Sequence, residues 1–180
     1  MNFKISNVEH YISPRELNVD EILKIYGISL ADIKKTMMDA VFVYRNLNEG
    51  FQKELAEQLK TVIEKYCQGM GRQIYRGSNL YSSAMRETPD VAIGLKGHSK
   101  KIFIEIEFRP NEHKDIVKFL IGHKKQTLEL GILIAAIDRK VIKKGYTTMP
   151  QYKKCIQTIE ALQSDCPILV MGIDGTWVPA

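Results

Sequence analysis

Apolar residues in the first third of the chain recur with the period of amphipathic helices, about 3.6 residues. Asn18 or Asp20 can cap a short helix that Gly27 stops. Ser29 is a suitable N-cap for a second helix, because Asp32 follows three residues later as in a capping box. The apolar face of this second helix is formed by Leu30, Ile33, Met37, Val41 and Tyr44. A third helix is predicted from about Phe51 to Cys67, so residues 1–70 are expected to be mainly helical.

The pattern changes after residue 71, where short apolar runs are separated by turn residues. Residues 73–75 and 91–95 are predicted strands, and the β-prone run 101–108 forms a hairpin with the strand before it. A helix is expected from Asn111 or Glu112 to about Leu130, ended by Gly131. A strand over 132–137, a helix over 151–163 and a strand over 167–173 complete the chain. We therefore predict an α/β fold in which helices flank a mixed central sheet, residues 71–180 form the sheet-containing core, and residues 1–180 form one domain.

Composition narrows the class of protein. The chain has 180 residues, of which 44% are hydrophobic and 26% charged, a balance typical of globular domains. It contains no apolar run near the roughly 20 residues that a membrane helix needs, and its first residues lack the apolar region of a secretory signal. The three cysteines share no metal-binding spacing, so we expect reduced thiols in a cytoplasmic protein that does not enter a membrane.

The net charge of +5 is compatible with a phosphate-bearing partner, although many basic proteins bind no nucleic acid. Much of the basic charge lies after residue 95. The basic side chains expected to contact DNA are Arg86, Arg109, Lys114, Lys118, His123, Arg139, Lys140, Lys143 and Lys144. Each has an ordinary alternative role, as a solvated surface charge or as the partner of a nearby acid.

The most informative segment is the predicted hairpin, which carries three acids. Alternate side chains of a strand share a face, so Glu105 and Glu107 point to the side opposite Ile104. The strand before it starts at Asp90, which brings a third carboxylate to the same end. Clustered carboxylates between large apolar residues repel one another and resist desolvation, and a divalent cation such as Mg²⁺ or Mn²⁺ relieves both costs. The alternative is a solvated outer face of an antiparallel sheet, where alternating Glu is common.

The three acids of the predicted hairpin resemble a known sequence signature. Pro89-Asp90, 14 intervening residues and then Glu105-Ile-Glu107 resemble the signature of the PD-(D/E)xK nuclease superfamily, with Glu in place of the usual Lys. That variant is similar to the type II restriction endonucleases of the BamHI and BglII group, and the resemblance covers about residues 88–137. It implies a restriction-endonuclease-like core, cleavage of double-stranded DNA, Mg²⁺ as cofactor and a homodimer.

The resemblance also implies roles for single residues. Asp90 and Glu105 would be the metal ligands, and all three acids would be catalytic, with the base role open to Glu107 or to metal-bound hydroxide. Lys124 or Lys125 of the following helix is a further candidate to reach the site. Some family members add an acid or amide from an upstream segment, for which Glu87 and Asn79 are preferred here over Glu57 and Glu64.

Two other classes of function remain open at this point. A non-catalytic DNA-binding or partner-binding module on a nuclease-like scaffold would keep the basic helix and lack metal affinity. A glycosidase would use paired carboxylates on another substrate, but such sites usually need aromatic platforms for the sugar, and the single Trp does not favour this.

Overall fold

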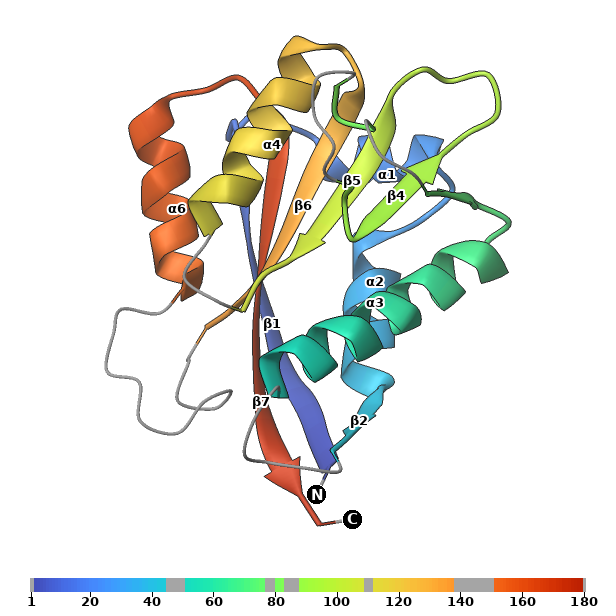
Figure 1. The fold of residues 1–180 in the computed structure, drawn as a ribbon, viewed down its shortest axis with the longest axis vertical. Helices are drawn as coiled ribbons and strands as arrows, with labels where there is room; N and C mark the ends of the chain where they lie inside the picture. The colour runs from blue at the N-terminus through green and yellow to red at the C-terminus, as the bar shows by residue number, and fades with distance from the viewer. Residues whose placement is uncertain are drawn as a thin grey trace.

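The computed structural model describes residues 2–44, 51–76, 80–82, 88–108, 112–137 and 151–179. Seven strands form one sheet in the order β2-β1-β7-β6-β5-β4-β3 (Figure 1). The strands are β1 (Asn2–Ser13), β2 (Val41–Val43), β3 (Gln73–Tyr75), β4 (Val91–Gly94), β5 (Lys101–Ile106), β6 (Leu128–Ala136) and β7 (Ile168–Val178). The helices are α1 (Val19–Ile25), α2 (Leu30–Asp39), α3 (Phe51–Gly69), α4 (Glu112–Lys124) and α6 (Gln151–Leu162).

The sheet is mixed, as predicted. Strands β5, β6 and β7 run parallel, whereas β3, β4 and β5 form an antiparallel meander and β1 pairs antiparallel with both β7 and β2. Helices cover both faces. Helices α1, α2 and α3 contribute to one hydrophobic core and α4 and α6 to the other, which gives three layers with the sheet in the middle.

Local sequence signals explain where several helices begin. The Asn18 side chain accepts a hydrogen bond from the Glu21 N–H at the start of α1, and the Ser29 hydroxyl accepts one from the Asp32 N–H at the start of α2. Gly27, with φ +60°, ends the turn after α1 in the left-handed region that glycine tolerates. Both caps and the extent of α3 confirm the predicted helices.

Three predicted boundaries were wrong. The N-terminal segment, expected to be mainly helical, opens with the long strand β1, and the apolar residues 41–43 form the edge strand β2 instead of extending α2. Helix α4 ends at Lys124, where Gln126 takes a positive φ of 59° and a turn leads directly into β6. Gly131 therefore lies inside a central strand and does not end a helix.

All three cysteines are buried thiols, in agreement with the prediction. Within the described residues, no helix is both long and apolar enough to cross a bilayer.

Candidate active site at the end of the central hairpin

The β4–β5 hairpin brings two of the predicted acids together. Val91 pairs with Ile104, so the antiparallel register, continued by one residue, places Asp90 opposite Glu105. The Ile106 N–H donates a hydrogen bond of 2.7 Å to Asp90 Oδ2, which fixes the orientation of that carboxylate against the neighbouring strand. The hairpin geometry that the sequence predicted is confirmed.

The alternation along β5 is also confirmed, and it bears on the alternative of a solvated outer face. Ile102, Ile104 and Ile106 belong to the core beneath α3, whereas Phe103 belongs to the core beneath α4 and α6. Glu105 shares the face of Phe103 and is only 4% exposed. A solvated outer face is therefore excluded for Glu105.

A buried polar cluster surrounds Glu105. The Tyr81 hydroxyl donates to Glu105 Oε1 over 2.5 Å, and the Lys118 ammonium donates to the same oxygen over 3.1 Å. Lys118 also donates to Asp115 Oδ1 over 2.7 Å. Within the described part of the chain, both hydrogen bonds to the Glu105 carboxylate go to Oε1, so Oε2 is the carboxylate oxygen outside those bonds.

Burial dominates the electrostatics of this cluster. Desolvation, with the charges of Asp115 and Asp90, raises the pKa of Glu105 to about 8, and Lys118 and the Tyr81 hydrogen bond oppose that rise. Desolvation likewise raises the pKa of Asp115, against the influence of Lys118. Burial lowers the pKa of Lys118, but the charges and hydrogen bonds of Glu105 and Asp115 outweigh it and leave the pKa above its usual value. The cluster concentrates negative charge around one fixed ammonium.

Glu107, the third predicted acid, lies just after the end of β5. Its N–H donates to the carbonyl of Ile134 on β6, and its side chain is half-buried. Its charge contributes to the raised pKa of Asp115 on α4, so the two carboxylates lie close enough to interact.

The donor chemistry of this site suits a hard divalent cation, because carboxylate oxygens are the ligands that Mg²⁺ prefers. Asp90 and Glu105 each have one oxygen held by the protein and a second oxygen outside those bonds. Among the described residues, no group of three or more His, Cys, Asp or Glu side chains has an arrangement that could hold a metal ion. A cage of three carboxylates is thus not assembled, but Mg²⁺ usually binds through one or two carboxylates together with water and substrate phosphate. Two held acids fit that mode.

The other predicted residues lie in several places. Lys114, Lys124 and Lys125 are exposed on or beside α4, and neither Lys124 nor Lys125 contacts the acids in the described structure. His123 lies 3.5 Å from Asp165 through its Nε2. Lys118, expected to contact DNA, is instead buried against Glu105, because it lies on the sheet-facing side of α4. The remaining candidates lie outside the described residues: Asn79, Arg86, Glu87, Arg109, Arg139, Lys140, Lys143 and Lys144.

Sequence reasoning missed Tyr81 and Asp115 and gave Lys118 a different role. One signal was available: Asp115 and Lys118 are separated by three residues and interleave with Ile116 and Phe119, so all four lie toward one side of α4. Nothing in the sequence around Tyr81 connects that residue to Glu105.

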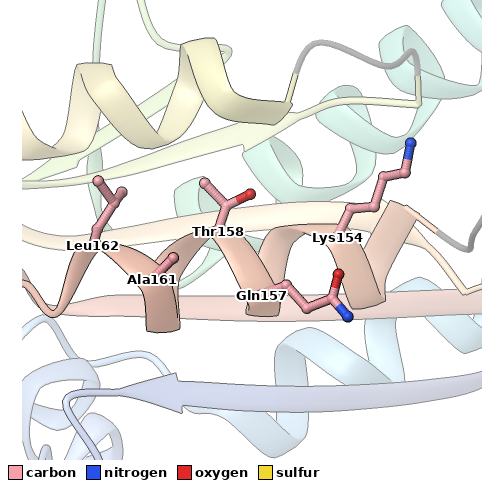
Figure 2. A pocket seen from close by; sticks show the side chains of 5 residues that line it. All are labelled: Lys154, Gln157, Thr158, Ala161 and Leu162. Atoms are coloured by element: carbon pink, nitrogen blue, oxygen red, sulfur yellow. The ribbon is translucent and has the colours of Figure 1, made fainter.

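A shallow hollow on α6 lies apart from these acids. It is lined by Lys154, Gln157, Thr158, Ala161 and Leu162, all on one helix (Figure 2). It contains none of the polar cluster residues and plays no part in the site.

Comparison with known proteins supports the fold. No protein-family model and no curated protein matches the chain. Solved structures do match: the chain has the fold of a restriction endonuclease. The restriction endonuclease BglII in complex with a DNA 16-mer superposes with a TM-score of 0.55 at 11% identity, covering 98% of this chain and 80% of BglII. Free BglII gives a TM-score of 0.51 at 12% identity, covering 98% and 82%. At this identity the likeness establishes the fold alone.

Proposed function

We propose that this protein is a Mg²⁺-dependent endonuclease that hydrolyses phosphodiester bonds in DNA. The observation that carries the proposal is that Asp90, just before β4, lies opposite Glu105 of β5 in a restriction-endonuclease-like fold, and each has one oxygen outside its protein hydrogen bonds. A buried carboxylate such as Glu105, with a half-buried acid opposite it, is costly for stability and is typical of functional sites.

In this proposal Asp90 and Glu105 hold the Mg²⁺ ion, for which Mn²⁺ can substitute. When bound, the ion lowers the pKa of water and stabilises the charge that develops on the phosphoryl oxygens. Asp90 is kept in place by the Ile106 N–H, and Glu105 by Tyr81 and Lys118. Glu107 is proposed to accept the proton of the attacking water or to orient that water, because it replaces the lysine of the signature and lies next to the pair.

The proposed substrate is double-stranded DNA cut at a specific site, as by a type II restriction endonuclease. BglII, which shares the fold, was solved with DNA, and the excess of basic over acidic residues suits a polyanion. Lys114 is exposed on α4 next to Asp115, and we propose that it contacts a phosphate of the DNA. Cutting both strands of a palindrome needs two related sites, so we propose a homodimer, which a light-scattering mass measurement would test.

Plasmid cleavage tests the activity. The wild type should convert supercoiled DNA to discrete linear fragments with Mg²⁺ or Mn²⁺ and should be inactive in EDTA. Asp90→Asn and Glu105→Gln should each lower the cleavage rate by at least about 100-fold, since both remove a ligand charge while keeping an oxygen that accepts the present hydrogen bonds. Asp39→Asn, at an exposed acid on α2, is the matched control and should cleave as the wild type does.

The alternative function, a DNA-binding module without catalysis, predicts a different result. It would bind DNA in a salt-dependent manner, show no metal-dependent cleavage and give no Mn²⁺ binding heat that Asp90→Asn abolishes. Cleavage that persists in EDTA or in both acid variants would refute the metal-dependent mechanism.

A further inference from the structure

The buried lysine of α4 is unusual among the described lysines of that helix. Lys114 and Lys124 are exposed, whereas Lys118 is only 7% exposed and its ammonium lies between two carboxylates, 3.1 Å from Glu105 Oε1 and 2.7 Å from Asp115 Oδ1. A buried ammonium is destabilising unless it is paired and hydrogen-bonded. The pairing is therefore a constraint on where α4 can sit over β5.

The arrangement fixes the position of the Glu105 carboxylate. The Tyr81 hydroxyl and the Lys118 ammonium converge on one oxygen of Glu105 from two different segments, which orients the carboxylate plane. Asp115, three residues before Lys118 on α4, holds the ammonium from the other side. The Tyr81 ring is in turn packed against Phe103, with ring centroids 4.6 Å apart, so the donor is itself held by the core.

We propose that Lys118 is a positioning residue of the nuclease site, which holds the Glu105 carboxylate oriented for the metal and supplies from α4 the positive charge that the third signature position, Glu107, lacks. Asp115 orients Lys118 in this role. The inference rests on the proposed nuclease function. It replaces our expectation that Lys124 or Lys125 reaches the site.

Lys118 acts through the geometry of its contacts, because its ammonium donates hydrogen bonds to both Glu105 and Asp115 and so ties the Glu105 carboxylate to α4. A role through Glu105 means that loss of Lys118 should weaken metal binding first and turnover as a consequence. Mutation of a residue that supports a metal ligand in this way typically lowers metal affinity or activity by about 10- to 100-fold.

The test compares Lys118→Met, Lys118→Gln and Lys118→Arg in the full chain. Mn²⁺ affinity is measured by isothermal titration calorimetry, cleavage at saturating metal gives kcat and KM for DNA, and thermal denaturation reports the fold. Lys118→Met and Lys118→Gln should bind Mn²⁺ at least about tenfold more weakly and lose turnover with little change in KM. Lys118→Arg, which keeps the charge, should recover most of the affinity. Lys53→Met, at an exposed lysine of α3, is the matched control.

The outcomes separate this inference from the proposed function. If wild type neither binds Mn²⁺ nor cleaves DNA, the nuclease proposal fails. If wild type does both, and folded Lys118→Met or Lys118→Gln binds Mn²⁺ within threefold of wild type, only the role of Lys118 is overturned. It is also overturned if Lys118→Arg binds as weakly as Lys118→Met, or if both neutral variants fail to fold, because Lys118 would then serve the core alone.

Discussion

Gly131 lies in the central strand β6, directly beneath the Phe119 ring of α4. A Cβ atom added at Gly131 would meet the ring Cγ at 2.6 Å and the two Cδ atoms at 2.7 and 2.9 Å, whereas ordinary contacts begin near 3.4 Å. Phe119 is fully buried and forms one core with Tyr81 and Ile116, so its ring cannot turn aside cheaply. Gly131→Ala therefore forces α4 away from the sheet by about 0.8 Å or more, the shortfall between these distances.

The magnitude follows from two opposing effects. Overpacking a core by one methyl group typically costs about 1–3 kcal/mol. Removing the backbone freedom that glycine has in the unfolded chain returns about 0.5–1 kcal/mol. We expect a net loss of roughly 1–2 kcal/mol in the free energy of unfolding, which lowers Tm by about 2–8 °C for a chain of this size.

Urea denaturation followed by Trp177 fluorescence measures the change, with Gly69→Ala as the control, because a Cβ at Gly69 meets nothing within 4 Å. The control should be neutral or stabilising by up to about 1 kcal/mol. A double-mutant cycle with Phe119→Leu tests the cause: the two substitutions should couple favourably by at least about 0.5 kcal/mol. Strictly additive effects, or a Gly131→Ala protein as stable as wild type, would refute the packing argument.

Three smaller predictions concern sites away from the acids. Burial lowers the pKa of His10, and so does the Lys34 ammonium, which lies 2.8 Å from His10 Nδ1. Because the folded-state pKa lies below the unfolded value of 6.5, the contribution of His10 to stability is fully present above pH 6.5 and decreases as the pH falls below that value. Lys34→Met should raise the His10 pKa measured by NMR and flatten this decrease, and an unchanged pKa would contradict the assignment. Gln58 hydrogen-bonds both the N–H and the carbonyl of Val43 on the edge strand β2, so Gln58→Ala should lower stability by about 1 kcal/mol and speed hydrogen exchange of the Val43 amide, whereas unaltered exchange would count against it. Leu59→Ala, at a fully buried residue of α3, should cost about 2–5 kcal/mol in denaturant unfolding, and a loss below 1 kcal/mol would show that the site collapses around the smaller side chain.

The sequence pattern did not predict the strand conformation of β1 and of residues 41–43, because their geometry departs from the regular spacing of a strand. In β1 the register shifts between Ile5 and Asn7, so the buried positions Phe3 and Ile5 are out of phase with Val8, and the period-2 signal of a strand is broken. In 41–43 the apolar residues continue the helical spacing of α2, yet Ala40 takes an extended conformation and the chain pairs with β1. Pairing partners far away in sequence decided both cases.

The sequence by itself determined the caps of α1 and α2, the β4–β5 hairpin and the sharing of one face of β5 by Phe103 and Glu105, because each depends on spacing within a few residues. The tertiary structure decided which helix faces which strand, and so it selected Lys118 over Lys124 and Lys125 and brought Tyr81 to Glu105. The physical reason is that a lysine on a helix has many solvated positions, and the packing of Ile116 and Phe119 into the core beneath α4 turns Lys118 inward, where a carboxylate must compensate its charge.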